Sequence, residues 1–374
     1  MLNRAIISTI AIYFILTGLP TWGQGSDAAR FTAWDTNKDG KLSREELPKP
    51  LRGEFDRADT DKDRALSRAE DAAAVGLIRG AGRTATVPAN VRKLGDIDYA
   101  GTGNPRQKLD LYLPAKRTDD KPLPMIVFIH GGAWRGGNKA GGASHVIPFV
   151  AGGRYAGVSI AYRLTGEARW PAQIHDCKAA IRWLKAHANE HGLDPARIAV
   201  WGTSAGGHLV AMLGVSGDDA SMEGMIGGNT GESSKVRCVV DFFGPTELLT
   251  MEEQSGRAAR NAADSPESIL VGGAIQQHPA MAKNASPIDH VGAGDAPHLI
   301  VHGTADPIVP FAQSVNYKKR LVDAGVPAVL ITVQDGRHGQ GFGPAVNHIV
   351  ADYLDQELLG MPHGMMDTTV QAGK

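Results

Sequence analysis

This chain of 374 residues contains only two cysteines, and its positive and negative charges almost cancel. Two cysteines cannot form a disulfide framework, so a small disulfide-stapled scaffold is excluded. The 39 Lys and Arg residues against 40 Asp and Glu residues leave a net charge of −1, which excludes the basic field that nucleic acid binding requires. With 42% hydrophobic residues, the chain can nevertheless bury a sizeable core, so a disordered polypeptide is also excluded.

The apolar run at the N-terminus is shorter than a membrane span. Ala5–Leu19 has 15 residues, whereas a helix that crosses a membrane needs about 20. One positive charge precedes this run, and small and polar residues follow it at 23–26. This layout predicts a signal peptide over residues 1–25, export to the periplasm or outside the cell, and no stable membrane insertion after its removal. An uncleaved N-terminal anchor is the alternative, and no cysteine follows the run to indicate a lipoprotein.

The two cysteines, Cys177 and Cys238, lie in no motif expected of a catalytic thiol. Their separation in the sequence does not say whether they meet in space. We expect two buried free thiols that take no part in the chemistry.

An acidic stretch that begins at Asp35 has the twelve-position spacing of a calcium-binding loop. Oxygen-bearing side chains stand at the first, third, fifth, ninth and twelfth positions, and Gly40 supplies the sharp turn at the sixth. A hard cation needs this spacing to complete a shell of roughly six to eight oxygens. The expected ligand positions, with the seventh residue included, are Asp35, Asn37, Asp39, Lys41, Ser43 and Glu46.

A second copy of this loop starts at Asp59, 24 residues after the first. Its sixth residue is Arg64, and a residue other than glycine in a left-handed turn costs on the order of 1 kcal/mol, so this site should be weaker. The expected positions are Asp59, Asp61, Asp63, Ala65, Ser67 and Glu70. Both loops resemble EF-hand loops, which implies a small α-helical EF-hand pair at 27–75 that holds structural calcium. Two acidic turns that bind no metal are the alternative.

The rest of the chain alternates apolar strands with amphipathic helices. A stretch rich in Gly, Ala and Thr at 76–90 is typical of a linker, and we expect a catalytic domain at 91–360 and a C-terminal tail at 361–374. The expected strands cover 125–130, 157–161, 197–201, 236–243, 298–302 and 328–333, and the clearest helices cover 174–187 and 206–213. This alternation predicts an α/β fold whose mostly parallel sheet has helices on both faces.

The pentapeptide Gly202–Gly206 stands between an expected strand and an expected helix. In that context, Gly-x-Ser-x-Gly forms the elbow that lifts a nucleophilic serine above the edge of the sheet. The pentapeptide alone is common by chance, but acid and base candidates follow it in the order Ser, Asp, His. We therefore predict that Ser204 is a nucleophile.

The acid and base candidates, Asp306 and His338, each follow one of the later apolar strands. Catalytic groups gather beyond the carboxyl ends of strands in open α/β sheets, so Ser204, Asp306 and His338 are predicted to form a triad. His302 lies inside its strand and is expected to be a packed core histidine. The other competitors precede their strand or lie too near His338 in sequence to orient it: Asp295 and Asp335.

A glycine pair follows the first apolar strand, in the stretch His130–Trp134. This stretch resembles the His-Gly-Gly-Gly motif of lipases and esterases, in which a backbone N–H helps to build the oxyanion hole. Ala133 replaces a glycine, so the sequence leaves open which amide of Gly131, Gly132 and Ala133 donates. The second expected donor is the N–H of Ala205. A tight turn without a catalytic role is the alternative.

Taken together, these motifs make residues 108–354 resemble an α/β-hydrolase of the esterase/lipase group. The chain is most similar to secreted bacterial esterases related to hormone-sensitive lipase and to bacterial feruloyl and acetyl-xylan esterases. The stretches that carry the resemblance are 130–134, 170–176, 194–209 and 302–310. The resemblance implies a serine esterase that works through an acyl-enzyme and needs no cofactor for catalysis, so any calcium would be structural.

The expected substrate is a small-molecule or polysaccharide-linked ester with a short acyl group or a plant-derived acid. Residues 245–297, where this fold usually accepts a cap, lack the pattern of a large hydrophobic lid. Trp134 and Trp170 are candidates for pocket walls, and ordinary packing is equally compatible with them. A prolyl-oligopeptidase-like serine peptidase and a calcium-binding protein with an inactive hydrolase domain are the alternatives.

Overall fold

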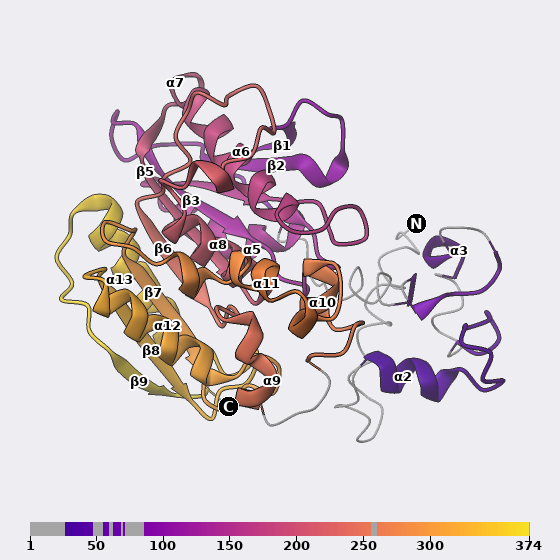
Figure 1. Cartoon of the computed structure of the whole chain (residues 1–374). Helices are drawn as coiled ribbons and strands as arrows, with labels where there is room; N and C mark the ends of the chain where they lie inside the picture. Colours follow the sequence, from indigo (N-terminus) through magenta and orange to yellow (C-terminus); the bar gives the residue numbers. More distant parts are fainter. Residues whose placement is uncertain are drawn as a thin grey trace. The chain divides into compact units, whose positions relative to one another are not determined.

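The computed structural model describes residues 27–47, 55–59, 63–68, 70–71, 86–255 and 260–373. The chain forms two compact units, residues 1–79 and 80–374 (Figure 1). The division falls within the stretch expected to be a linker. The expected signal peptide and most of that linker lie outside the described residues, so these two expectations remain predictions.

The described residues of the N-terminal unit include two short helices, α2 (Asp27–Trp34) and α3 (Phe55–Ala58). A small apolar core joins them, and its buried members are Phe31, Leu42, Leu47, Phe55 and Leu66. Leu42 and Leu66 form an antiparallel bridge, with N–H···O distances of 2.9 and 2.8 Å between their backbones. These leucines occupy the eighth positions of the two acidic loops, so the loops pair with each other at equivalent points.

The second unit is built on one sheet of nine strands in the described part of the chain. Their order across the sheet is β1-β2-β4-β3-β5-β6-β7-β8-β9. Only the β1–β2 and β2–β4 pairs are antiparallel, and every other neighbouring pair is parallel. The strands are β1 (Val91–Asp98), β2 (Lys108–Pro114), β3 (Leu123–Ile129), β4 (Ala156–Ile160), β5 (Leu193–Thr203), β6 (Cys238–Phe242), β7 (His298–Gly303), β8 (Ala328–Gln334) and β9 (Thr368–Gln371).

Helices cover both faces of the sheet. The α-helices of this unit are α5 (Ala143–Ala151), α6 (Ala172–Ala186), α7 (Ala188–His191), α8 (Ala205–Val215), α9 (Met251–Ser255), α10 (Pro266–Val271), α11 (Pro279–Asn284), α12 (Phe311–Asp323) and α13 (Pro344–Leu359). Short 3-10 helices are η2 (Pro105–Gln107), η3 (Lys139–Gly142), η4 (Ala220–Met222), η5 (Leu248–Thr250), η6 (Ile275–Gln277) and η7 (Pro287–His290). One core cluster packs α6 and α8 against the sheet, and another packs α5 and α13 against it.

The predicted α/β fold is confirmed, and all six expected strands are present. Strands β3, β4, β6 and β7 are buried along their whole length. A strand covered on both faces needs an unbroken apolar run, which is the pattern that made these strands visible in the sequence. The predicted helices at 174–187 and 206–213 correspond to α6 and α8.

The expected C-terminal tail is wrong, because residues 368–371 form strand β9 of the sheet. Ile331 to Gln334 of β8 pair in parallel with Thr368 to Gln371. The outer edge of β8 would otherwise present unpaired backbone groups, and β9 satisfies them. In the part of the chain that the structure describes, no helix has the length and apolar character needed to cross a membrane. Cys177 and Cys238 are both free and buried, as predicted.

Candidate active site

Ser204 lies at a sharp turn between strand β5 and helix α8. Its φ of 56° and ψ of −121° are unusual for a residue with a side chain. A Cβ added to Gly202 would lie 2.1 Å from the carbonyl oxygen of Gly206, and a Cβ added to Gly206 would lie 2.1 Å from that of Ile129. The turn therefore requires glycine at both positions, as the motif predicts.

The structure brings Ser204, His338 and Asp306 together. His338 Nε2 lies 3.0 Å from Ser204 Oγ, and His338 Nδ1 lies 2.7 Å from Asp306 Oδ2. A carboxylate only accepts hydrogen bonds, so the proton of His338 is on Nδ1 and the free lone pair of Nε2 faces the serine hydroxyl. The three residues follow β5, β7 and β8, parallel strands whose carboxyl ends share one edge of the sheet.

The Asp306 side chain is completely buried and heavily hydrogen bonded. Its Oδ1 accepts the amides of Ile308 and Val309 at 2.7 and 3.0 Å. Burial alone would favour the neutral acid, but hydrogen bonds from His302 and His338 outweigh it and hold the pKa of this carboxyl well below its usual range. Asp306 is therefore an anion that is ready to orient His338.

Of the competing residues, His302 is buried as expected but does more than pack. Its Nε2 lies 3.0 Å from the carbonyl oxygen of Val309 and 3.3 Å from Asp306 Oδ2. The Asp335 side chain has a different partner, because its Oδ1 accepts a hydrogen bond from the Gln334 side chain. The contact between His302 and Asp306 was not predicted, because the sequence places His302 only as an apolar-strand residue.

The predicted oxyanion donors lie beside the elbow. A Cβ on Gly131 would lie 2.5 Å from the Thr203 carbonyl oxygen and 3.2 Å from Ser204 Cβ, so this segment contacts the turn at Ser204. Among the hydrogen bonds of the described residues, none has its donor in the amides proposed for the oxyanion hole: Gly131, Gly132, Ala133 and Ala205. Each of these backbone N–H groups can therefore donate to a negatively charged oxygen of a ligand.

The segment 131–134, called the oxyanion loop below, has a left-handed backbone at three successive residues. Gly132, Ala133 and Trp134 have φ values of 115°, 54° and 57°. Glycine takes this conformation freely, but each of the other two residues carries a cost of roughly 1–2 kcal/mol. The replacement of glycine by Ala133 therefore leaves the turn intact and makes it strained.

Trp134 and Trp170 pack in the core, which is the alternative to pocket walls that the sequence left open. Their exposed fractions are 2% and 4%, and both belong to the main core cluster. The Trp134 indole donates to His208 Nδ1 at 3.2 Å, and the Trp170 indole donates to Asn284 Oδ1 at 2.7 Å. Burial is possible for both indoles because each N–H has a partner inside the protein.

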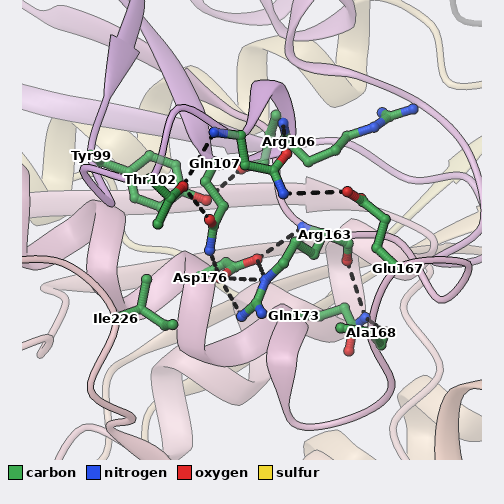
Figure 2. A network of polar contacts seen from close by, with 12 residues as sticks. Tyr99, Thr102, Arg106, Gln107, Arg163, Glu167, Ala168, Gln173, Asp176 and Ile226 are labelled. Atoms are coloured by element: carbon green, nitrogen blue, oxygen red, sulfur yellow. Dashed lines mark hydrogen bonds and ion pairs between the residues drawn. The ribbon is translucent and has the colours of Figure 1, made fainter.

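Asp176, which ends the motif 170–176, is the centre of a buried polar network (Figure 2). Arg163, just past β4, binds it with Nε and Nη2 at 2.8 Å, and Gln107 donates to its Oδ1 at 2.7 Å. Thr102 in turn donates to Gln107 Oε1 at 2.7 Å. The network ties α6 to the ends of β2 and β4, so this motif contributes to the scaffold and not to the reacting groups.

Phe243 is a residue near the site that sequence reasoning missed. Its ring lies 4.6 Å from the His338 ring between centroids, and it also packs against Phe342. Phe243 directly follows β6, the strand between those that lead to Ser204 and to Asp306. That position is the signal that would have indicated it, because the carboxyl end of β6 opens on the same edge.

The two acidic loops of the N-terminal unit share a hydrogen-bond pattern. In both, the first residue accepts the sixth amide, Asp35 from Gly40 and Asp59 from Arg64, each at 3.0 Å. In both, the twelfth residue accepts the ninth amide and hydroxyl. Arg64 has a φ of 69°, so it takes the left-handed turn expected at the sixth position.

The residue types of these loops fit a hard cation. Among the residues that the structure describes, no three His, Cys, Asp or Glu side chains form a cluster that could hold a metal ion. Glu46 accepts the amides of Asn37 and Ser43, and Asp63 pairs with Lys41. Asp61 lies outside the described residues.

Comparison with known proteins finds that this chain is similar to proteins named as esterases. A family model, BD-FAE, matches residues 109–321. Esterase LipC of Mycobacterium tuberculosis is 34% identical over 218 residues, which cover 58% of this chain and 53% of that protein. The chain thus spans little more than half the length of the curated relatives that it matches, with 59% for a probable carboxylic ester hydrolase, LipM, of the same organism.

Two solved structures are also similar. A truncated carbohydrate esterase from gut microbiota has a TM-score of 0.66 and 35% identity, and the match covers 72% of this chain and 96% of that one. A bifunctional GH43-CE protein of Bacteroides eggerthii has a TM-score of 0.65 and 33% identity, with coverage of 71% and 35%.

Proposed function

The chain belongs to the BD-FAE family and has an α/β-hydrolase fold, and we propose that it hydrolyses carboxylic esters with Ser204 as the nucleophile. The observation that carries the proposal is the triad of Ser204, His338 and Asp306. His338 Nε2 lies 3.0 Å from Ser204 Oγ, and His338 Nδ1 lies 2.7 Å from Asp306 Oδ2. The similar proteins are named as esterases, which supports the reaction class.

In this reaction His338 is the general base. Its Nε2 takes the hydroxyl proton as Ser204 Oγ attacks the acyl carbon, while Nδ1–H stays with Asp306. Asp306 keeps the imidazole in the required tautomer and stabilises the imidazolium that forms. The lowered pKa of Asp306 supports this role, because only the ionised carboxylate can stabilise the cation.

The negative charge that develops on the acyl oxygen is received by backbone amides of the oxyanion loop and of Ala205. A donor of this kind stabilises the transition state by roughly 2.7–4 kcal/mol. The tetrahedral intermediate then collapses, and the alcohol leaves with the proton from His338. Water attacks the acyl group on Ser204 through the same steps and releases the acid.

The substrate is an ester with a short acyl group or a plant-derived acid, either small or linked to a polysaccharide. The structural relative named a carbohydrate esterase supports this class. Between β6 and β7, the described residues form α-helices of only five or six residues, α9, α10 and α11. Helices of this length offer little continuous apolar surface for a long fatty chain.

The test is a comparison of substrates on the purified protein. The set contains p-nitrophenyl acetate, p-nitrophenyl palmitate, methyl ferulate, acetylated xylan and a proline-containing peptide anilide. We expect the best short-acyl or hydroxycinnamoyl ester to exceed the palmitate and the anilide by at least about tenfold in kcat/KM, and Ser204→Ala to remove nearly all turnover. A preference for the anilide would instead make the protein a peptidase, and full activity in Ser204→Ala would disprove the nucleophile.

The N-terminal unit is proposed to bind calcium in a structural role. The hydrogen bonds repeated in both loops and the Leu42–Leu66 bridge support this proposal. Oxygens of the predicted ligand positions would hold the ion, which would link distant parts of each loop. The ion would take no part in ester hydrolysis. The first loop, which has Gly40 at its sixth position, should bind more tightly than the second.

Export is also part of the proposal, on the strength of the apolar run at 5–19 and the polar residues after it. The measurement is the N-terminal sequence of the protein recovered from the periplasm or the medium. Cleavage near residue 25 is expected. A recovered chain that still begins at Met1 would favour the uncleaved anchor.

A further inference from the structure

Trp134 and His208 connect the oxyanion loop to the helix that follows the nucleophile. Trp134 is the last residue of the loop, and His208 is in the first turns of α8, four residues after Ser204. The indole Nε1 donates to His208 Nδ1 at 3.2 Å, and the two rings meet edge to face at 5.1 Å between centroids. Both side chains are buried, with exposed fractions of 2% and 0%.

The partners of His208 allow one protonation state only. The indole N–H can only donate, so His208 Nδ1 must be an acceptor. On the other side, His208 Nε2 lies 2.7 Å from the carbonyl oxygen of Ala285, which can only accept, so Nε2 carries the proton. Burial lowers the pKa of His208 to about 4, which agrees with a neutral ring.

The oxyanion loop needs such an external support. Ala133 and Trp134 both have left-handed φ values, and a strained backbone of this kind persists only where its surroundings hold it. Two hydrogen bonds hold Trp134: its indole N–H donates to His208, and its carbonyl oxygen accepts from the Thr165 amide at 2.9 Å. The first of these ends on the same helix whose start supplies the Ala205 amide.

We propose that Trp134 and His208 are positioning residues, which hold the oxyanion-loop amides in register with Ser204 and with the Ala205 amide. The chain of contacts continues to Ala285, so the segment between β6 and β7 helps to fix the loop. This inference rests on the proposed ester hydrolysis and adds to it the part of the structure that shapes the oxyanion hole. Neither residue touches the reacting atoms, so both act through the loop.

The test compares two substitutions of the same kind. Trp134→Phe keeps a packed ring and removes the donor to His208. Trp170→Phe is the matched control, because Trp170 is also buried and packs edge to face on His208, at 5.4 Å, but its indole donates to Asn284. For each variant, kcat and KM are measured with p-nitrophenyl acetate and with its thiono analogue, in which sulfur replaces the carbonyl oxygen.

We expect Trp134→Phe to lower kcat for the oxo ester by about tenfold or more with KM changed less than about threefold. The ratio of oxo to thiono turnover should fall as well. Sulfur accepts hydrogen bonds from the oxyanion-hole amides poorly, so turnover of the thiono ester depends less on the position of these amides. Trp170→Phe should leave both kcat and that ratio within about threefold of the wild type. Equal losses in the two variants, or an unchanged ratio in Trp134→Phe, would overturn the proposal.

A second pair keeps the test decisive if Trp134→Phe folds poorly. His208→Gln can still accept from Trp134 and donate to Ala285, whereas His208→Leu can do neither. The glutamine variant should retain most of the oxo/thiono ratio and the leucine variant should lose it, with circular dichroism used to correct for unfolded protein. If the wild-type protein shows no ester turnover that depends on Ser204, the proposed function is overturned. If the wild type is active but the Trp134 and His208 variants keep its kcat and its oxo/thiono ratio, only this inference is overturned.

Discussion

His302 Nε2 lies 3.3 Å from Asp306 Oδ2, the oxygen that also faces His338. The Asp306 carboxylate is thus flanked by two histidines, the fully buried His302 and the partly buried His338. His302 Nδ1 lies 2.6 Å from the hydroxyl of Ser314 on α12, so a helix on the outside of the sheet supports the orientation of Asp306. The Asp335 carboxylate instead accepts a hydrogen bond from the Gln334 side chain.

Replacement of Asp306 by Asn should lower kcat by roughly 10⁴, because the amide favours the wrong tautomer of His338. Asp335→Asn is the matched control, since Asn tolerates the left-handed φ of 60° at this position. Its kcat should stay within a few fold of the wild type. Steady-state kinetics on both variants decide the matter, and a larger loss in Asp335→Asn would mean that the acid has been misassigned.

Gly206→Ala should distort the turn that holds Ser204. The added Cβ would lie 2.1 Å from the Ile129 carbonyl oxygen, and backbone on that side cannot move without disturbing β3. We expect kcat to fall at least about a hundredfold, together with a lower Tm. Gly228→Ala is the control, because nothing lies within 4 Å of its added Cβ. Activity near the wild-type level in Gly206→Ala would contradict the close packing of the elbow.

Stability should fall as the solution is acidified from pH 6.5 toward pH 4. Burial lowers the pKa to about 4 in four histidines: His130, His145, His208 and His298. In the unfolded chain these groups have a pKa of about 6.5, so the unfolded state binds more protons in this window and unfolding becomes easier as pH falls. Urea midpoints measured between pH 7 and pH 4.5 test this expectation.

Two carboxyl groups oppose this trend. Burial raises the pKa of Asp241 to about 7, and burial also raises that of Asp295. Their stabilising contribution is lost as pH rises, but four histidines outnumber them. His298→Gln should flatten the pH dependence, whereas Gln at the exposed His348 should not. A urea midpoint that increases on acidification would refute the assignment.

Calcium should raise the Tm of the N-terminal unit in the full chain and change kcat little. Glu46→Gln should weaken binding at least about tenfold, as the twelfth residue of such a loop supplies two oxygens. Glu45→Gln removes the same charge from the neighbouring exposed residue and serves as the control. Isothermal titration with CaCl₂ provides the measurement. The absence of binding heat in the wild type, or equal heats in the two variants, would remove the calcium proposal.

Removal of strand β9 should affect both stability and catalysis. Ala372 donates to the Gln334 carbonyl oxygen and Gly373 to that of Gly341, at 3.0 Å each, so this end of the chain lies along the loop that carries His338. A variant that stops at Asp367 should have a lower Tm and a kcat reduced at least about fivefold, within the range set by misplacement of a catalytic group.

The control for this truncation is the double substitution of Thr369 and Gln371 by Ala, which keeps the backbone pairing of β9 and changes only exposed side chains. Its Tm and kcat should remain close to those of the wild type. A truncated chain that behaves like this control would show that β9 contributes nothing to the His338 loop.

The sequence by itself determined the layers of the fold and the residues of the triad. Parallel strands buried on both faces require continuous apolar runs, and such runs are local patterns. The Gly202–Gly206 turn requires glycine at both ends because of its backbone geometry, so it too can be recognised from a short stretch of sequence. Asp306 and His338 were predicted because loops past parallel strands meet at one edge, a rule that needs no knowledge of side-chain contacts.

Only the tertiary structure decided the roles of residues whose surroundings come from distant parts of the chain. Strand β9 has a half-exposed, polar sequence, and it is a strand because β8 offers an open edge. Trp134 and Trp170 can be core residues because His208 and Asn284 satisfy their N–H groups. Hydrogen-bond partners more than 70 residues apart leave no periodic pattern in the sequence, so their effect is set by the packing of the folded chain.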